Sequence, residues 1–172
     1  TVYFSDLMYN QSNWRDINKD KSISRKEFNK KFNYEMSSSL SYNYSITKAK
    51  RLVKSIHPFS EIHRFKNYPA TQAHHIFLSS QYPELADLPE NIISLTPNQH
   101  YYRAHPNNKT SKIDRSYQLA CLISKLDSIE SDYMNSYGNY EKDKFIDVIN
   151  IGLEKDFSYT IDFEELKQKI IQ

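Results

Sequence analysis

Glycine and cysteine are scarce in this chain of 172 residues, and each scarcity excludes a class of site. The only two glycines are Gly138 and Gly152, which excludes the glycine-rich loops that bind phosphates in P-loop and dinucleotide-binding proteins. The single cysteine, Cys121, excludes a disulfide framework and a zinc knuckle built from several cysteines. Because Cys121 lies in an apolar run, we expect a buried, unreactive thiol.

Long apolar runs and a strong net charge are missing as well. No run approaches the roughly 18 apolar residues that cross a bilayer, and we recognise no signal peptide, so we expect a cytoplasmic protein without a membrane partner. The formal net charge is only +2, so a surface that binds nucleic acid would have to come from local clusters. Hydrophobic residues make up 38% and charged residues 26%, as in folded globular proteins.

Three regions differ in their residue patterns. Residues 1–60 are polar and predict short helices at 24–32 and 45–56, with contacts to DNA as one role. Residues 61–110 carry most of the histidines, and residues 111–172 predict helices throughout, with apolar stripes at helical spacing and a last helix capped at Asp162. We therefore expect an α+β protein that is mainly helical, with the three regions packed into one compact domain.

The middle region predicts two strands followed by a helix. Two apolar runs, 73–78 and 91–96, are separated by a loop that contains prolines. A strong helix start follows: Thr96 is a good N-cap, Pro97 suits the first helical position, and Gln99 completes a capping box. We expect this helix to end near residue 104 or 105, because Pro106 disfavours helix in the residue before it.

Polar residues suited to phosphodiester hydrolysis occupy this predicted unit. His74 and His75 lie in the first strand, Asn91 opens the second, and His100 lies in the first turn of the helix. A histidine can take the proton of an attacking water near neutral pH, and a divalent cation can neutralise the leaving oxygen. Imidazole nitrogens suit zinc, nickel, cobalt or manganese better than magnesium. An asparagine between strands can hold the loop by hydrogen bonds.

Two segments of the chain resemble the motif of HNH, or ββα-metal, nucleases: AHHI at 73–76 and ENIISLTPNQH at 90–100. The double histidine is similar to the variant in colicin DNases and in some HNH restriction enzymes. The resemblance implies a ββα-metal core, embedded here in helices, and it implies a role for each residue. His75 is the general base, His74 and His100 bind a divalent metal (magnesium, manganese, nickel or zinc), and Asn91 supports the loop.

Two details of the resemblance depend on local geometry: whether His74 and His75 converge, and which residue is the third ligand. Adjacent residues of an ideal strand point to opposite faces, so His74 and His75 converge only if the strand ends, twists or bulges there. Colicin DNases place a further histidine four residues after the helix histidine, where this chain has Ala104. His105 follows His100 by five positions instead of four, so on a regular helix it would not take the place of that further histidine. The third ligand, or a phosphate contact, therefore stays open among His105, Asn107 and Asn108.

Two further patterns predict binding. Basic residues near the motif and in the segment 48–54 are candidates for DNA contacts: Arg103, Lys109, Lys112, Arg115, Lys50 and Arg51. An acidic loop near the start of the chain resembles an EF-hand calcium loop, although Lys21 replaces its turn glycine. Its candidate calcium ligands are Asp16, Asn18, Asp20, Ser22 and Glu27. The alternative for this loop is a polar segment that caps the helix at Ser24.

From these patterns we expect an enzyme: a metal-dependent DNA endonuclease that hydrolyses phosphodiester bonds with one metal ion. A type II restriction or other defence enzyme acting on double-stranded DNA, as a homodimer if the site is symmetric, is the favoured role. A non-specific nuclease toxin or a phage nicking enzyme would keep the same site. A module of another class would bind calcium or DNA without catalysis and would not need His75.

Overall fold

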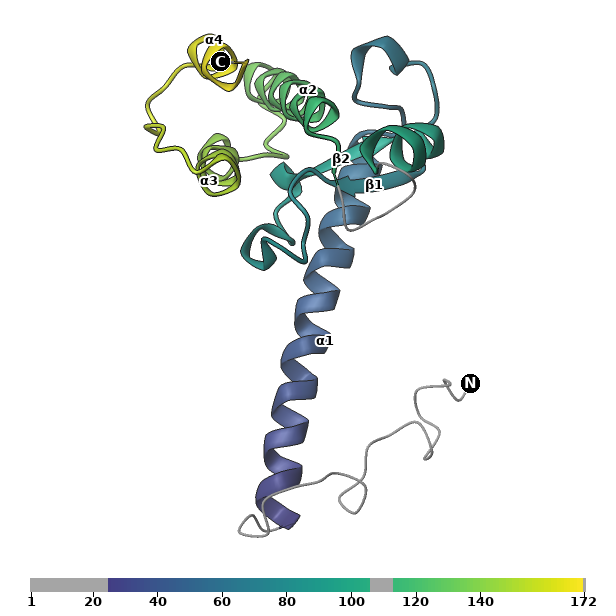
Figure 1. The fold of residues 1–172 in the computed structure, drawn as a ribbon, viewed down its shortest axis with the longest axis vertical. Helices are drawn as coiled ribbons and strands as arrows, with labels where there is room; N and C mark the ends of the chain where they lie inside the picture. The colour runs from purple at the N-terminus through teal and green to yellow at the C-terminus, as the bar shows by residue number, and fades with distance from the viewer. Residues whose placement is uncertain (1–24, 106–112, 172) are drawn as a thin grey trace. The chain divides into compact units, whose positions relative to one another are not determined.

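The computed structural model describes residues 25–105 and 113–171, with side chains from residue 39 onward. Contacts divide the chain into two units, Thr1–Asn43 and Tyr44–Gln172. The elements follow this order in the chain (Figure 1): α1 (Arg25–Ile56), η3 (His63–Phe65), β1 (Gln72–His75), η4 (Pro83–Leu85), η5 (Pro89–Asn91), β2 (Ile92–Leu95), η6 (Gln99–Ala104), α2 (Arg115–Met134), α3 (Lys142–Leu153) and α4 (Phe163–Ile171). The α+β, mainly helical prediction is confirmed.

One helix replaces the two short helices predicted for the first region. α1 runs without interruption through residues 33–44, which lie between the two predicted helices. The reason lies in the sequence, because neither proline nor glycine occurs between Arg25 and Ile56, and Pro58 follows the end of the helix. Ala49 and Val53, one turn apart on α1, are buried in the core of the Tyr44–Gln172 unit.

The two predicted strands form an antiparallel pair, but both are shorter than expected. β1 pairs with β2 so that His74 lies opposite Ile93 and His75 opposite Ile92. The backbone N–H of Ile76 donates one more bond, to the carbonyl of Asn91. Asn91 itself ends the η5 turn before β2, whereas the sequence predicted that it opens the strand. The strands are short because residues 77–91 leave the sheet as a loop with two 3-10 turns.

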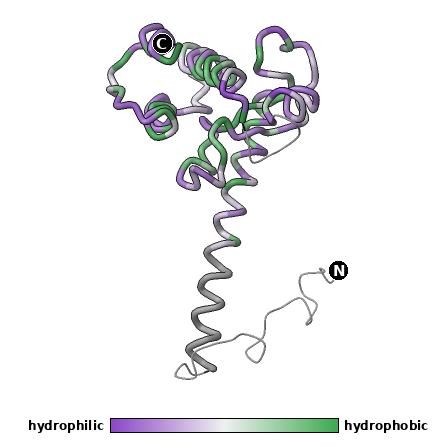
Figure 2. The backbone as a smooth tube through the Cα atoms, viewed as in Figure 1, coloured by the Kyte–Doolittle hydropathy of each residue, from purple (hydrophilic) through white to green (hydrophobic). Residues whose placement is uncertain are grey.

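The core of the Tyr44–Gln172 unit joins the sheet to the C-terminal helices. Figure 2 shows apolar residues along β2 and along α2 and α3. Fully buried members come from every layer: Ile76, Ile92, Leu95, Leu122, Leu126, Phe145, Ile149 and Leu166. On α2 the apolar residues at helical spacing, Leu119, Leu122, Leu126, Ile129 and Tyr133, pack into or against the core except at the end, where Tyr133 is 65% exposed and contacts Phe163 at the surface. Cys121 is buried, as predicted.

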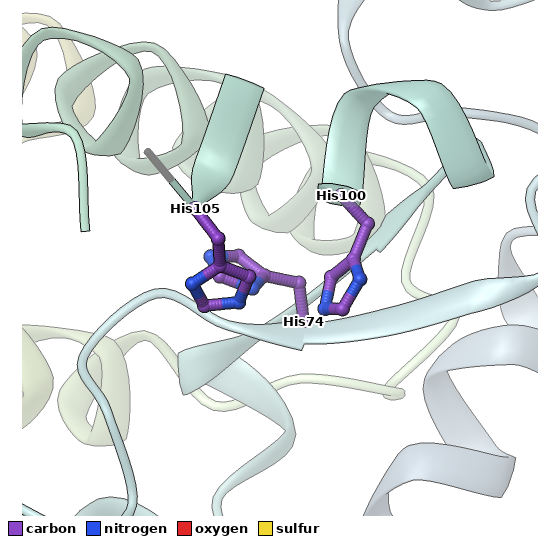
Figure 3. Close-up of side chains that lie close together, drawn as sticks. All are labelled: His74, His100 and His105. Atoms are coloured by element: carbon purple, nitrogen blue, oxygen red, sulfur yellow. The ribbon is translucent and has the colours of Figure 1, made fainter. Parts of the chain in front are cut away.

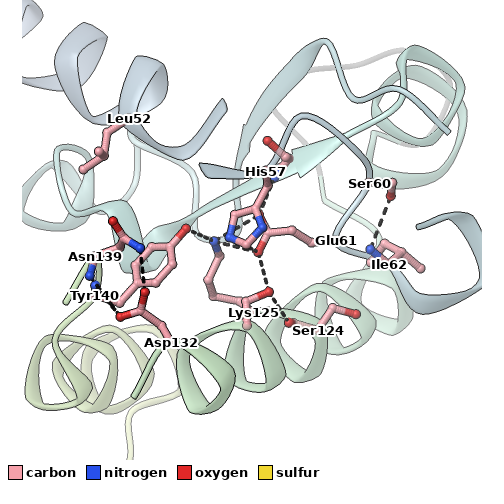
Figure 4. Close-up of polar contacts among 12 residues, drawn as sticks. Leu52, His57, Ser60, Glu61, Ile62, Ser124, Lys125, Asp132, Asn139 and Tyr140 are labelled. Carbon is pink, nitrogen blue, oxygen red and sulfur yellow. Dashed lines mark hydrogen bonds and ion pairs between the residues drawn. The ribbon is translucent and has the colours of Figure 1, made fainter. Parts of the chain in front are cut away.

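A buried ion pair links α2 to the segment between α1 and β1 (Figure 4). The side chains of Glu61 and Lys125 are fully buried, with the Lys125 amine 2.8 Å from a Glu61 carboxylate oxygen. The other carboxylate oxygen accepts a bond from the backbone N–H of Ser94 in β2. Tyr140 and Ser128 complete the network through their hydroxyl groups. Burial of a charge requires such partners, so Glu61 holds three parts of the chain in register.

In the part of the chain that the structure describes, no helix combines the length and the apolar character needed to cross a membrane.

Candidate metal centre

The helix that carries the motif begins where the sequence predicted it. The Thr96 hydroxyl accepts a bond from the backbone N–H of Gln99, and the Gln99 side chain accepts one from the N–H of Thr96. This reciprocal pair is the predicted capping box. The Gln99 side-chain oxygen also accepts a bond from the hydroxyl of Ser60, which is buried. The start of the helix is therefore fixed both to β2 and to the segment before β1.

The same helix departs from α geometry directly after its first residues. Gln99–Ala104 form a π-helix, η6, in which backbone bonds join residues five apart. An α-helix turns about 100° per residue, so it would place His105 about 140° away from His100. The wider π turn instead returns His105 to the face of His100. The backbone carbonyl of Ala104 then accepts a bond from the N–H of Asp114, the N-cap of α2, which fixes the end of η6.

Three imidazole rings meet at this face (Figure 3). His74 comes from β1, His100 from η6, and His105 from the residue after η6. The ring centroids lie 4.9 to 5.3 Å apart, and one nitrogen from each ring lies within 4.8 Å of the others. His74 and His105 are buried, and His100 is partly buried. This group can hold a metal ion.

The three histidines fit a transition metal chemically. Zinc–imidazole bonds of about 2.0–2.1 Å place tetrahedral ligand atoms about 3.4 Å apart, so small rotations of the rings would close the site. Nδ1 of His100 is buried and has no hydrogen-bond partner among the described residues. Buried polar atoms are normally satisfied, and an ion would satisfy this one. A donor set of three neutral nitrogens suits zinc, nickel, cobalt or copper and disfavours magnesium.

The electrostatics of the cluster keep the rings of His74 and His100 neutral. Burial, and then the charges of the other histidines and of Lys50, lower the pKa of His74 well below its ordinary value. Burial, His105 and Lys50 lower the pKa of His100 to about 4. Metals bind the neutral imidazole, so His74 and His100 present free lone pairs at neutral pH without first losing a proton.

His75, next to His74 on the strand, lies outside the cluster and has a different partner. Its Nε2 lies 2.9 Å from the backbone carbonyl oxygen of Ala86, in the loop between the strands. A carbonyl oxygen only accepts, so Nε2 must carry the proton and Nδ1 keeps its lone pair. Burial lowers the pKa of His75, partly offset by this bond. The ring is therefore a neutral imidazole in one fixed tautomer.

The strand ends at His75. An end of the strand at this point was one of the three ways in which His74 and His75 could converge on one site. The two side chains are nevertheless separate: His74 joins the three-histidine cluster, whereas His75 faces the loop that carries Ala86. They occupy adjacent positions of one strand, so their opposite directions follow from strand geometry.

Asn91 holds the loop that returns from β1 to β2. Its side chain is fully buried and makes three bonds to the backbone. The amide oxygen accepts a bond from the N–H of Phe77, and the amide nitrogen donates to the carbonyls of Phe77 and Leu85. Leu85 directly precedes Ala86, so Asn91 also positions the carbonyl that orients His75. The structure thus gives Asn91 the supporting contacts expected of it.

The predicted DNA contacts have different surroundings. Lys50 is partly buried, and its charge reaches His74, His75 and His100, whose pKa values it lowers. Arg51, Arg103 and Arg115 are exposed. Lys109, Lys112, Asn107 and Asn108 lie outside the described residues, as do Asp16, Asn18, Asp20 and Ser22 of the acidic loop; Glu27 lies in α1, but its side chain is not described.

Sequence reasoning missed the geometry that recruits His105. The expectation that its phase was wrong assumed an α-helix, and the π turn overturns it. The signal was the spacing itself, because five residues is the hydrogen-bond spacing of a π-helix, and π turns occur frequently at functional sites. The pairing of Glu61 with Lys125 was missed as well, since nothing in the local sequence joins residues 64 positions apart.

Comparisons of this chain with protein-family models, with curated proteins and with solved structures found no match.

Proposed function

We propose that this protein is a metal-dependent DNA endonuclease of the HNH type. The observation that carries the proposal is the three-histidine cluster on β1 and η6, with His75 at the adjacent strand position in a fixed neutral tautomer. A metal site alone would suit many proteins. The three-histidine site and the oriented neutral imidazole of His75, at the next position of the same strand, are the two kinds of group that hydrolysis of a phosphodiester needs.

His75 is the general base in this proposal. Its Nδ1 takes a proton from the attacking water, and the Ala86 carbonyl stabilises the positive charge that then develops on the ring. His74, His100 and His105 hold the cation. When bound, a divalent cation supplies positive charge for the leaving oxygen and for the phosphate. Asn91 keeps the loop in place, so the base does not need to be ordered during the reaction.

The position of Lys50 favours a substrate that carries several negative charges. Its amine lies close enough to the cluster for its charge to lower the pKa of three histidines. The positive charge of Lys50 would repel a bound cation. A phosphate at the metal would offset this repulsion, because its negative charge attracts both the cation and Lys50. We therefore assign Lys50 to the scissile phosphate or its neighbour. Cleavage of double-stranded DNA by a homodimer in restriction or another defence system is the cellular role that we propose.

Plasmid cleavage is the direct test. The purified chain is incubated with supercoiled plasmid in EDTA and then with zinc, nickel, manganese or magnesium added singly, and nicked and linear products are quantified. We expect cleavage that requires metal and that falls about 10²- to 10⁴-fold in His75→Ala, the range for loss of a general base. His63→Ala is the matched control, because His63 is exposed and binds Asp127 instead.

Zinc binding, measured by calorimetry, must be retained in His75→Ala and lost in His74→Ala. If His75→Ala cuts as fast as the parent, the assigned base is wrong. If no metal restores cleavage to the parent chain, the nuclease proposal itself fails. Mapping the ends of the products on defined DNA separates a restriction enzyme, which cuts at a fixed sequence, from a non-specific toxin or a nicking enzyme.

A further inference from the structure

An exposed loop precedes β1 and combines aromatic and basic side chains. We call residues 57–70 the aromatic–basic loop. Phe59, Phe65 and Tyr68 are 49%, 42% and 59% exposed. Arg64 and Lys66 alternate with them and are exposed as well. Neither Arg64 nor Lys66 makes an ion pair with a residue that the structure describes.

The loop is held rigidly although its tip is exposed. Phe59 and Pro69 form an antiparallel bridge, and backbone bonds join Ser60 to Tyr68 and Ala70 to Pro58. Phe65 ends the short helix η3, and its ring lies 5.9 Å from that of Tyr68. The aromatic rings therefore do not need to be ordered when a ligand binds, which removes an entropic cost of binding.

Charge favours an anionic partner for this loop. Its single acidic residue, Glu61, is buried against Lys125 at the base of the loop (Figure 4). His63 pairs with Asp127 of α2, which leaves the tip with the positive charges of Arg64 and Lys66. Aromatic rings alternating with cations are the combination that binds single-stranded nucleic acid: bases stack on rings, and cations contact phosphates.

The loop is also joined to the candidate metal centre. The hydroxyl of Ser60 donates a bond to the side chain of Gln99, the first residue of η6, and both residues are buried. β1, which carries His74, begins two residues after Ala70. The base of the loop and the metal centre are thus held to each other through buried contacts. Stacking on Phe65 and Tyr68 requires bases that are not already stacked in a duplex.

We infer that the aromatic–basic loop binds unpaired nucleotides of a DNA strand, by stacking on Phe65 and Tyr68 and by phosphate contacts with Arg64 and Lys66. The inference rests on the proposed function for the identity of the substrate. It adds that the duplex is bound with a few nucleotides unpaired beside the cleaved bond, either opened on binding or already unpaired at a nick, branch or overhang.

Binding is measured without cleavage, so this test is independent of catalysis. Fluorescence anisotropy in EDTA compares a labelled single strand of about 12 nucleotides with a blunt duplex of the same sequence. We expect the full chain to bind the single strand more tightly. Phe65→Ala with Tyr68→Ala should weaken that binding about tenfold or more and leave duplex binding nearly unchanged.

Two controls separate stacking from other effects. Tyr159→Ala removes a ring that is 52% exposed in the connection between α3 and α4, and it should leave both affinities unchanged. Phe65→Trp keeps a stacking surface and should keep binding, whereas Phe65→Leu keeps only apolar character and should lose it. All substituted side chains are exposed, and thermal unfolding followed by circular dichroism confirms that each variant folds.

The cations give a second, independent readout. Each phosphate contact contributes about 0.7 to the slope of log affinity against log salt for a single strand, so Arg64→Gln with Lys66→Gln should reduce that slope by about 1.4. Lys155→Gln, an exposed lysine after α3, should not change it. The inference is wrong if the aromatic variant binds single strands as the parent does. It is also wrong if the aromatic variant weakens duplex binding equally, or if the loop's role proves to be capture of a protein.

Cleavage and binding can fail separately. A chain that binds single strands through the loop but never cuts would overturn the proposed function and leave the inference standing. A chain that cuts with metal but binds independently of Phe65 and Tyr68 would do the reverse.

Discussion

The rings of His100 and His105 lie 4.9 Å apart, nearly perpendicular at 87°, although the two residues are five positions apart in the chain. An α-helix places residues four apart on one face, and a fifth residue turns away from it. The π-helical turn Gln99–Ala104 absorbs that extra residue. It thereby completes a cluster of three histidines that regular helix geometry would leave with two.

Removal of one residue from η6 should preserve the metal site. Tyr102 is 72% exposed, so its deletion removes little packing. The deletion would place the two histidines four residues apart, in the register of an α-helix. We expect zinc affinity, measured by calorimetry or chelator competition, to stay within about threefold of the parent, because the ligand face is restored by a different route.

The opposite change is the control. An alanine inserted after Tyr102 places the histidines six residues apart and should weaken zinc binding as strongly as His105→Ala. In both variants the loss of zinc affinity should exceed the roughly 10- to 100-fold loss that follows when a residue that only hydrogen-bonds a metal ligand is removed. Zinc binding that is kept in both the insertion and His105→Ala would show that His105 is not a ligand.

Asn91→Ala should destabilise the protein by about 3 kcal/mol. The side chain is fully buried, and its loss would leave the N–H and the carbonyl of Phe77 without a partner and would remove one of the two bonds to the Leu85 carbonyl. Urea unfolding followed by circular dichroism measures the change. Asn91→Asp should be at least as harmful, because a carboxylate oxygen would then face two carbonyl oxygens. Asn67→Ala, at an exposed position, should change stability by less than about 0.5 kcal/mol.

Glu90→Gln should stabilise the protein more at high pH than at low pH. The Glu90 carboxyl is buried, and only one of its oxygens accepts a bond, from the N–H of Glu141. Burial raises the pKa of Glu90 above its ordinary value of 4.5, partly offset by that bond. The folded state therefore holds its proton more tightly than the unfolded state does. This contribution to stability is present below pH 4.5 and is lost as the pH rises through the raised pKa.

Glutamine keeps the oxygen that accepts from Glu141 and does not titrate, so it removes only the pH-dependent part. Urea unfolding of parent and variant at pH 4.5 and 7.5 gives the difference in unfolding free energy. We expect this difference to favour the variant more at pH 7.5. Titration of the histidines is common to both proteins and cancels. An identical difference at both pH values would refute the assignment.

Gly152→Ala should destabilise the protein by about 1–3 kcal/mol through overpacking. An ideal Cβ at this position of α3 would overlap the ring of Phe77, which is almost fully buried. Phe77→Leu removes part of the ring and should relieve the overlap. A double-mutant cycle of the two changes, measured by urea unfolding, should therefore give a favourable coupling. Additive effects would show that the two residues do not touch.

Local patterns in the sequence predicted the local parts of the site. The start of the motif helix follows from Thr96, Pro97 and Gln99, because capping depends on neighbours in the chain. The positions of His74 and Asn91 near the strand ends follow from short apolar runs bounded by turn residues. The lengths of the strands did not follow, because pairing ends where the partner strand leaves the sheet.

A mainly helical α+β chain, with histidines on a strand pair and a helix, could be predicted from local patterns, since hydrophobic periodicity and capping act over a few residues. Which histidines meet depends on the three-dimensional fold. The π turn at Gln99–Ala104 recruits His105, and the carbonyl of Ala86 takes His75 into a separate contact. The fold also decides that Glu61 and Lys125 pair. Helix type, tautomer and charge pairing depend on atoms distant in the chain, and local sequence patterns carry no information about those contacts.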